Sequence, residues 1–392
     1  MTALSTIPEH VPLPAGFRAT GLHCGLKAQG RPDLALILAD RPVTAAAIYT
    51  QNRLVGAHVH VCRDHLQKSG GLVRAVLVNA RNANCATGEK GIADARHCCD
   101  ELAKRIGCPV EQVLMLSTGP IGAPLPTEKI TSHLDALLGR VDDDGGMDFA
   151  RAIMTTDTYP KAVHHQEGGV AVTGFAKGSG MIHPDMATML GFLLTDATVD
   201  GASSGGLLRA VADRSFHRVT VDGDTSPNDT LLLLASGRTQ SDAPATVLTA
   251  TARELARHIA ADGEGATRLI TVVVRGAPSE QEAAHVGRVI ATSPLVKTAI
   301  AGRDPNWGRI LSAAGRAGVP FPAEAARVWV GTAEVYTEGV PHPEREDVAH
   351  RHLLDERDIE IGVDLAAGNA EAEVWTCDLT KDYVQINADY RS

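Results

Sequence analysis

The chain has 392 residues, of which 44% are hydrophobic and 4% aromatic, and its formal net charge is −10. This length suffices for a large core, in one layered α/β unit or in two domains. Nucleic-acid binders need a basic face, and the basic residues here form no run, so the composition disfavours that class of partner. No apolar stretch approaches membrane-spanning length.

Seven cysteines, an odd number, occur without a C-x-x-C pair. This pattern disfavours a disulfide framework and a zinc site and favours a reducing compartment. The N-terminal residues lack the basic region and long apolar core of a signal peptide. We therefore expect a globular protein of the cytoplasm that binds neither nucleic acid nor membrane and holds no metal ion.

Strands and helices are interspersed along the chain. The β-branched run at 72–80 predicts a buried strand. Apolar residues at helical spacing, closed by Gly107, predict a helix over 89–107. Further along, the patterns predict a strand over 111–122, a buried strand over 188–197, a helix over 246–265, a strand over 267–277, a helix over 279–293, and strands over 326–339 and 359–365.

The acidic, glycine-containing segment 140–148 predicts an exposed loop and is the candidate domain boundary. Alternating helices and strands often form a doubly wound sheet. The usual phosphate fingerprints are absent, however: KGSG (177–180) lacks the end of a P-loop, and no G-x-G-x-x-G follows a strand. Nucleotide binding is therefore disfavoured.

No serine-hydrolase elbow and no H-E-x-x-H zinc motif is present, and the histidines are scattered. The segment KGSGMIHPDMATML (177–190) directs attention to Thr188. Gly178 and Gly180 permit unusual backbone angles, and Ala187 adds little bulk beside the peptide bond that precedes the threonine. Taken alone, the segment is better explained as a glycine loop before a buried strand.

A threonine hydroxyl needs a base that takes its proton. Attack of the Thr188 hydroxyl on the Ala187 carbonyl would cut the chain and make Thr188 an N-terminal residue, whose α-amino group can serve as that base. This amine titrates at about 7.7–8.0 when unperturbed, which suits proton transfer under cell conditions. Acyl transfer also needs donors for the oxyanion. Thr118 and Gly119 of STGPIG are candidates, although an ordinary turn after a strand is the favoured explanation when the segment is taken alone.

KGSGMIHPDMATML resembles the cleavage segment of the ornithine acetyltransferase family, also called glutamate N-acetyltransferases. The similarity is colinear and covers essentially the whole chain. It includes the segments ARNANCATG (80–88), STGPIG (117–122), MTTDTYPK (154–161), VDGDTSPNDT (221–230), DGEGAT (262–267), SPLVKTAIAGRDPNWGRI (293–310) and YVQINADYRS (383–392).

The resemblance implies that the chain cuts itself between Ala187 and Thr188, into an α chain of residues 1–187 and a β chain of residues 188–392 that stay intertwined as one catalytic unit. Thr188 matches the nucleophile, and Thr118 and Gly119 match the oxyanion-hole pair. The substrate pocket is matched by Thr155, Lys177, Thr188, Glu264, Asn387 and Ser392. The implied fold is an α/β, layered αββα sandwich related to the N-terminal-nucleophile enzymes, assembled as α2β2 heterotetramers or larger.

The implied reaction moves acetyl from N2-acetyl-L-ornithine to L-glutamate through acetyl-Thr188, in a ping-pong sequence without a cofactor. Acetyl-CoA is left open as an alternative acetyl donor. His183, ARNAN and the terminal Ser392 depart from the usual family pattern. These departures leave the nucleophile intact but leave open whether the enzyme serves arginine biosynthesis or a secondary-metabolite pathway.

Two other classes of function are weighed: an N-terminal-nucleophile amidase or aminopeptidase that releases product to water, and an uncut, non-catalytic protein with the same fold. Three segments are predicted as scaffold. The aspartates of VDGDTSPNDT, Asp222, Asp224 and Asp229, lack EF-hand spacing and indicate a hydrogen-bonded turn. Asn82 and Asn84 are expected to tie down a turn, and Trp307 and Arg309 to pack and pair.

Overall fold

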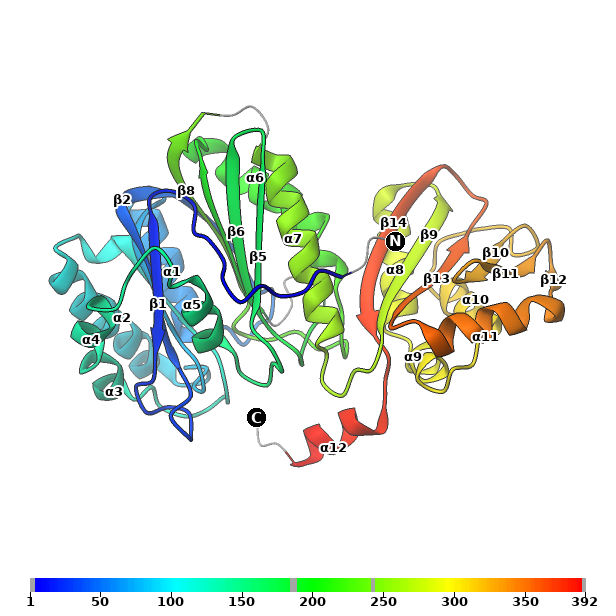
Figure 1. Cartoon of the computed structure of the whole chain (residues 1–392), viewed down its shortest axis with the longest axis horizontal. Helices are drawn as coiled ribbons and strands as arrows, with labels where there is room; N and C mark the ends of the chain where they lie inside the picture. Colours follow the sequence, from blue (N-terminus) through cyan, green and yellow to red (C-terminus); the bar gives the residue numbers. More distant parts are fainter. Residues whose placement is uncertain (1–3, 184–188, 241–243, 390–392) are drawn as a thin grey trace.

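The computed structural model describes residues 4–183, 189–240 and 244–389 (Figure 1). Over these ranges the chain forms two mixed β-sheets with flanking helices. The first sheet has eight strands and lies between residues 17 and 239, and the second has six strands and lies between residues 269 and 377. The expected α/β class is confirmed.

The first sheet has the strand order β4-β3-β2-β8-β7-β6-β5, and β1 also pairs with β2. The pairs β3–β4 and β7–β8 are parallel, whereas the other neighbours are antiparallel. The strands are β1 (Phe17–Leu22), β2 (Leu34–Tyr49), β3 (Leu72–Asn79), β4 (Val113–Ser117), β5 (Lys161–Glu167), β6 (Val170–Lys177), β7 (Leu190–Ala197) and β8 (Thr230–Thr239).

The second sheet has the order β12-β11-β10-β13-β9-β14. Its strands are β9 (Leu269–Ala277), β10 (Arg327–Val330), β11 (Ala333–Thr337), β12 (Val340–Pro341), β13 (Asp358–Asp364) and β14 (Ala370–Cys377). The helices are α1 (Ala57–Lys68), α2 (Gly88–Ile106), α3 (Thr127–Thr131), α4 (Leu134–Leu138), α5 (Gly146–Ile153), α6 (Gly201–Asp213), α7 (Pro244–Ala261), α8 (Glu280–Ala291), α9 (Pro294–Ala301), α10 (Trp307–Gly315), α11 (Glu346–Asp355) and α12 (Lys381–Asp389). Short 3₁₀ turns occupy Val110–Gln112, Phe216–Arg218 and Pro343–Arg345.

The long strand β2 takes part in two half-sheets. Its beginning pairs with β1 and β3, and its end, from Thr44 to Tyr49, pairs with β8. The register with β3 shifts between Leu38 and Val43, where Pro42 cannot donate a ladder hydrogen bond. The shift lies directly before the part of β2 that pairs with β8.

The core shows that these halves pack face to face. One buried cluster combines Ile37 and Leu116 of the first half with Phe175, Phe192 and Leu232 of the second. The outer face of the first half packs against α2, and the outer face of the second half packs against α6 and α7. Helices thus cover both outer faces (Figure 1), and the expected αββα layering is confirmed.

Strand β7 is apolar on both faces because both faces are covered. Phe192 contacts Phe149 of α5 with ring centroids 5.1 Å apart, whereas Leu193 joins the cluster around α7. A strand buried on both sides needs a continuous apolar run rather than an alternating one. This requirement explains the sequence LGFLL directly after residue 189.

Helix α7 connects the two sheets. Its Leu255 and Ala256 belong to the same buried cluster as Leu269 of β9 and Trp375 of β14. The second sheet has its own core between β9–β14 and the helices α8, α10 and α11. Trp307 stacks on Tyr336 with ring centroids 4.8 Å apart, which agrees with its expected packing role.

The predicted elements correspond closely to the observed ones. The helix expected over 89–107 is α2, which ends at Ile106 and is capped by Gly107 in the left-handed conformation, with φ of 67°. The run 326–339 forms two strands, β10 and β11, rather than one. The strand expected over 111–122 is shorter, because β4 ends at Ser117 and a turn follows.

Segment 140–148 is not a domain boundary. Asp142 pairs with Ala19 of β1, and α5 begins at Gly146. Gly145 lies so close to β1 that a Cβ would come 1.9 Å from the Ala19 carbonyl oxygen. The change from the first sheet to the second occurs later, between α7 and β9.

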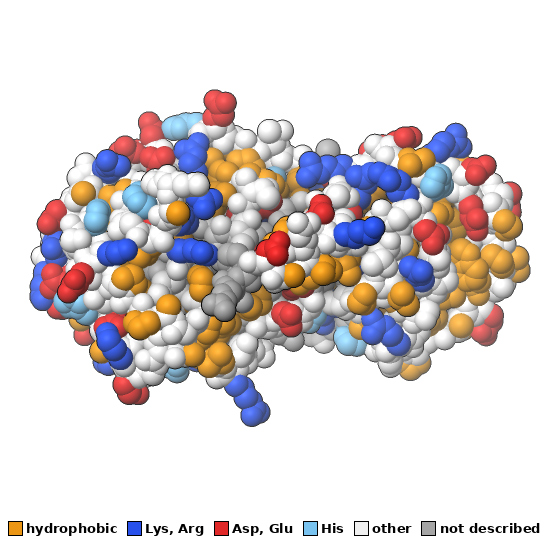
Figure 2. All heavy atoms as spheres, turned by 90° about the horizontal axis from the view of Figure 1, so that it is seen from below, with side chains coloured by type: hydrophobic (Ala, Val, Ile, Leu, Met, Phe, Trp, Pro, Cys, Tyr) orange, Lys and Arg blue, Asp and Glu red, His pale blue; other side chains and the backbone are white. Residues whose placement is uncertain are grey.

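The face seen in Figure 2 carries acidic and basic side chains interspersed with apolar ones. Among the described residues, no helix is both long and apolar enough to cross a membrane.

Candidate active site

A cavity of about 140 Å³ lies where the ends of β4 and β6 meet the segment that precedes β8. Six residues expected at the site line this cavity: Thr118, Gly119, Thr155, Lys177, Glu264 and Asn387. They come from regions of the chain that are far apart in sequence, and the fold brings them together. Ala187, Thr188 and Ser392 lie outside the described residues.

Backbone hydrogen bonds fix the turn after β4, which contains Thr118 and Gly119. The Thr118 N–H donates to the Asn79 carbonyl at 3.0 Å, and the Thr118 carbonyl accepts from the Asn82 N–H at 2.9 Å. Gly119 has φ of 137°, and a Cβ there would lie 2.5 Å from the backbone of Arg81 and Asn82. Only glycine fits this close approach.

Asparagines fix the surroundings of this turn. The Asn82 side chain donates to the Pro124 carbonyl at 2.9 Å and accepts from the Asn84 N–H at 2.8 Å. Asn228, which precedes β8, donates to the Ala83 and Ser117 carbonyls at 2.6 and 2.8 Å. Asn82 and Asn84 therefore tie down the turn as expected, and Asn228 joins the two half-sheets at the cavity.

Lys177 ends β6 with its side chain buried beside the turn. Its Nζ donates to Thr118 Oγ1 at 3.2 Å, and only 4% of the residue is exposed. Burial lowers the pKa of Lys177, while the negative charge of Asp157 opposes that change. Because Lys177 occupies a lone pair of the Thr118 oxygen, the hydroxyl proton of Thr118 remains available to a group in the cavity.

Asp157 supports this arrangement and was not singled out from the sequence. Its Oδ1 accepts from Lys161 Nζ and from the Gly178 N–H, both at 2.7 Å. Its Oδ2 accepts from the Thr155 N–H at 2.8 Å. Burial opposes ionisation of Asp157, yet Lys161 and Lys177 hold its pKa well below the usual range. The carboxylate thus positions Thr155, which lines the cavity, and Gly178, which follows Lys177.

Lys161 completes a buried charge network. Its Nζ contacts both Asp157 and Asp262, the latter at 2.5 Å, and its side chain is fully buried. Burial raises the pKa of Asp262. Buried ions need such partners, since an unpaired charge in the interior is costly. The network joins β5 to the loop that carries Glu264.

Glu264 lies on the other side of the cavity. Its N–H donates to the Ser179 carbonyl at 2.8 Å, and its Oε2 accepts from Asn387 Nδ2 at 2.9 Å. Gly180 lies against it, since a Cβ there would come 2.5 Å from the carboxylate and would displace the Glu264 side chain. The structure thus places Asn387 of the last helix against a carboxylate that lines the cavity.

Two aspartates of VDGDTSPNDT hold the chain on either side of residues 184–188. Asp222 accepts from the N–H groups of Met181 and Ile182, at 2.6 and 2.9 Å. Asp229 Oδ1 accepts from the Met189 N–H at 2.9 Å. Their turn was expected to be scaffold alone. The side-chain contacts across 40 or more residues could not be read from the sequence.

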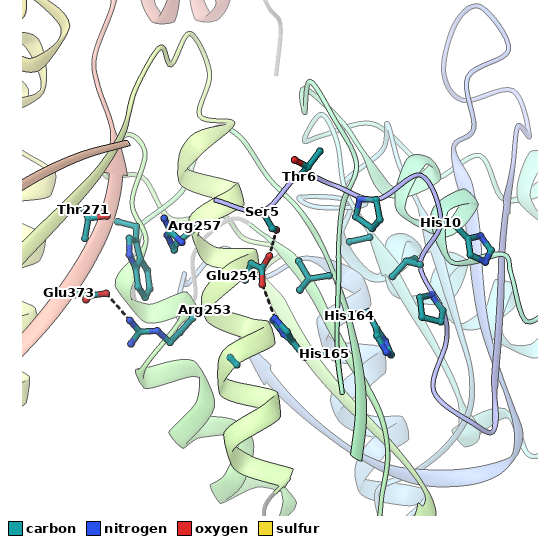
Figure 3. A pocket seen from close by; sticks show the side chains of 17 residues that line it. Ser5, Thr6, His10, His164, His165, Arg253, Glu254, Arg257, Thr271 and Glu373 are labelled. Atoms are coloured by element: carbon teal, nitrogen blue, oxygen red, sulfur yellow. Dashed lines mark hydrogen bonds and ion pairs between the residues drawn. The ribbon is translucent and has the colours of Figure 1, made fainter. Parts of the chain in front are cut away.

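A larger cavity of about 810 Å³ lies beneath the N-terminal segment (Figure 3). Figure 3 shows two ion pairs in this cavity: His165 with Glu254, 3.0 Å apart, and Arg253 with Glu373, 2.7 Å apart. It contains none of the residues expected at the active site. The smaller cavity is therefore the candidate active site.

The described residues contain no group of side chains arranged to hold a metal ion. All seven cysteines are unpaired, and all but Cys108 are buried. Burial raises the pKa of thiols such as Cys62, to about 12, which makes them poor nucleophiles.

A model described as the ArgJ family matches residues 18–392. The chain belongs to the ArgJ family.

Individual relatives of this chain are also ArgJ proteins. The arginine biosynthesis bifunctional protein ArgJ of Thermus thermophilus is 46% identical over 97% of this chain and 99% of its own length. The ArgJ protein of Prochlorococcus marinus MIT 9313 is 44% identical over 97% of this chain and 93% of its own. The departures at His183, ARNAN and Ser392 thus occur in a chain that matches ArgJ proteins nearly end to end.

Solved structures include ArgJ of Bacillus halodurans, which is 41% identical, with a TM-score of 0.50, over 52% of this chain and 100% of the solved chain. The ornithine acetyltransferase of Mycobacterium tuberculosis, solved with ornithine, is 35% identical, with a TM-score of 0.42, over 45% of this chain and 94% of the solved chain.

Replacing Asp157 by asparagine removes the charge that balances Lys161 and Lys177. We expect Asp157→Asn to lower the free energy of unfolding by about 3–5 kcal/mol, the usual cost of breaking a buried ion pair. Urea unfolding measures this loss. Asp64→Asn, which removes the carboxylate of a more exposed pair with Lys68, is the control and should change little. Equal losses in the two variants would contradict the role given to Asp157.

Proposed function

We propose that this ArgJ-family chain transfers acetyl from N2-acetyl-L-ornithine to L-glutamate through an acetyl ester of Thr188, after cutting itself between Ala187 and Thr188. The observation that carries the proposal is the meeting of Thr118, Gly119, Lys177 and Glu264 at one cavity, in a chain 41–46% identical to several ArgJ proteins. The names of these relatives place them in arginine biosynthesis, which favours that pathway for this chain.

Cleavage comes first in the proposed mechanism. The Thr188 hydroxyl attacks the Ala187 carbonyl carbon, and water hydrolyses the resulting ester, which frees the Ala187 carboxylate and the Thr188 amine. The match to the Bacillus halodurans structure supports a cut, because the whole solved chain corresponds to only 52% of this one. The products would be an α chain of residues 1–187 and a β chain of residues 188–392.

Acetyl transfer then uses the freed amine as base. The amine takes the Thr188 hydroxyl proton while the oxygen attacks the acetyl carbonyl of acetylornithine. The Thr118 hydroxyl and the Gly119 N–H stabilise the oxyanion, and Lys177 keeps the Thr118 proton directed away from its own Nζ. The proton passes to the nitrogen of ornithine, which leaves. Glutamate then attacks the acetyl ester with its amine and departs as N-acetylglutamate.

The charges at the cavity suit amino-acid substrates. Lys177 is positioned to attract a carboxylate, and Glu264, held by Asn387, to attract an ammonium group. Thr155 and Ser392 complete the proposed pocket. The cut chains are proposed to assemble as α2β2 units in the cytoplasm, without a cofactor.

Replacing Thr188 by alanine tests the cut. We expect wild-type protein to separate under denaturing conditions into two chains that meet at Ala187–Thr188, and Thr188→Ala to remain one chain, because the attacking oxygen is gone. Intact-mass spectrometry with N-terminal sequencing measures this. Thr188→Ser keeps a hydroxyl and should still be cut. Two fragments from Thr188→Ala would exclude Thr188 as the nucleophile, and uncut wild type would support a non-catalytic protein.

Replacing Thr118 by valine tests the oxyanion hole. Thr118→Val removes one donor while keeping the side-chain shape, so kcat should fall by about 10²–10³-fold, the usual effect of losing such a donor. KM should change far less. Steady-state kinetics measure both values. Thr251→Val is the control, because Thr251 is also buried but donates to a backbone carbonyl within α7. Equal kinetics for the two variants would remove Thr118 from the mechanism.

The acceptor separates a transferase from a hydrolase. With acetylornithine and glutamate present, N-acetylglutamate should appear in step with ornithine. Without glutamate, ornithine release should stop after one acetyl group per site, because the ester has no acceptor. Chromatography of both products measures this, and acetyl-CoA is assayed in parallel as donor. Acetate as the main product in the presence of glutamate would favour the amidase or aminopeptidase alternative.

A further inference from the structure

Asn228 precedes β8 on the second half-sheet, yet its side chain binds residues of the first half-sheet beside the turn after β4. Its Nδ2 donates to the Ser117 carbonyl at 2.8 Å and to the Ala83 carbonyl at 2.6 Å. Asn228 is 5% exposed, and Ser117 and Ala83 are buried as well. The reaction proposed above gives Asn228 no role, although the residue lines the cavity.

These two hydrogen bonds restrain both ends of the turn formed by Thr118–Gly119. Ser117 precedes the turn and is bound by Asn228 directly. Pro120 follows the turn, and its carbonyl accepts from the Ala83 N–H at 3.1 Å. Because Asn228 also binds the Ala83 carbonyl, one side chain restrains the chain before and after the two proposed oxyanion donors.

The planarity of the peptide bond transmits this restraint to the donors. In the peptide between Ser117 and Thr118, the carbonyl accepts from Asn228, and the N–H donates to the Asn79 carbonyl at 3.0 Å. Since a peptide unit is planar, hydrogen bonds at its two ends fix its orientation. The directions of the Thr118 side chain and of the Gly119 N–H that follows depend on that orientation.

The Asn228 amide is oriented for its donors, and its own oxygen stays unpaired. The Oδ1 atom is buried and accepts no hydrogen bond from any described residue. Turning the amide over would place this oxygen against the two carbonyl oxygens that now accept from Nδ2. Gly56 leaves room for the oxygen, because a Cβ there would lie 2.6 Å from Asn228 Oδ1. Since buried acceptors are rarely unpaired, this orientation indicates that holding the turn is what the side chain does.

We propose that Asn228 is a positioning residue for the oxyanion hole. By holding the turn at both ends, it keeps the Thr118 hydroxyl and the Gly119 N–H directed at one point in the cavity, as donors to a developing oxyanion must be. Asn228 acts through the turn and does not itself touch the acetyl group. The inference rests on the proposed function, because it concerns the oxyanion of that reaction.

Replacing Asn228 by alanine removes both donors and releases the turn. We expect Asn228→Ala to lower kcat by about tenfold to a hundredfold, because displacing a catalytic group by about 1 Å can cost about a hundredfold in rate. KM should change far less, since the turn positions donors to the oxyanion and not the groups that bind the charged ends of the substrate. Steady-state kinetics per mole of cut chain measure both values, with intact mass and urea unfolding recorded for each preparation.

A double-mutant cycle with Thr118→Val separates positioning from a general loss of stability. If Asn228 acts through the turn, the fall in kcat of the double variant should be clearly smaller than the product of the two single falls, because the hydroxyl that Asn228 positions is already gone. Single effects that multiply would overturn the proposal. An unchanged kcat in Asn228→Ala would also overturn it, as would a fall in Asn228→Ala with none in Thr118→Val.

Asn52→Ala is the matched control. Asn52 also donates its Nδ2 to a carbonyl of the segment before β8, that of Thr225 at 2.8 Å, but it lies outside the lining of the cavity. Asn52→Ala should therefore keep the wild-type kcat. Equal falls in kcat for Asn228→Ala and Asn52→Ala would overturn the proposal.

Gly56→Ala decides the question if Asn228→Ala does not fold or is not cut. The added methyl group would contact Asn228 Oδ1 and displace the amide while leaving both of its donors in place. The backbone of Gly56, with φ of −62° and ψ of 145°, suits alanine. A lower kcat that is not additive with Thr118→Val supports the proposal, and an unchanged kcat overturns it. If wild-type protein is neither cut nor active, the proposed function itself fails, which is a separate result.

Discussion

The double pairing of β2 is the constraint on which the rest of the structure depends. One strand pairs with β3 at its beginning and with β8 at its end, and the two half-sheets pack face to face around a shared buried cluster. The C-terminal ends of β3 and β4 then meet the N-terminal ends of β7 and β8, and Asn228 joins them through the Ser117 carbonyl. The candidate site lies where these strand ends meet. Backbone N–H and C=O groups there lie beyond the hydrogen-bonded ladders and are available to bind other groups.

Buried charges fix the positions of polar groups where these strand ends meet. The Lys161 network and Lys177 place two ammonium groups and the carboxylates of Asp157 and Asp262 beside one wall of the cavity. Asp222 and Asp229 hold the chain on the two sides of the proposed cut. Hydrophobic packing alone would stabilise the layers without fixing the direction of any polar group. The carboxylates instead hold individual N–H groups at defined places, which a reaction at one peptide bond requires.

Much of the fold could be predicted from the sequence, because local patterns carry it. The helical spacing around Leu102 and the continuous apolar run of β7 report burial on one face and on two faces, respectively. The segment 140–148 was misjudged because its composition is that of an exposed loop, whereas the close contact of Gly145 with β1 depends on the folded backbone. The run 326–339 divides at a two-residue turn, Gly331 and Thr332, which is a local glycine signal that the strand prediction passed over.

The same distinction between local patterns and folded contacts applies to the residues of the candidate site. Thr118, Gly119, Lys177 and Glu264 were found through short motifs shared with a family, and the structure brings them to one cavity. Asp157 and Asp229 were not assigned to the site, because their roles consist of contacts with residues distant in sequence or with backbone N–H groups, which leave no motif of side-chain types. A carboxylate that binds backbone N–H groups can be recognised only once the fold shows which groups it binds.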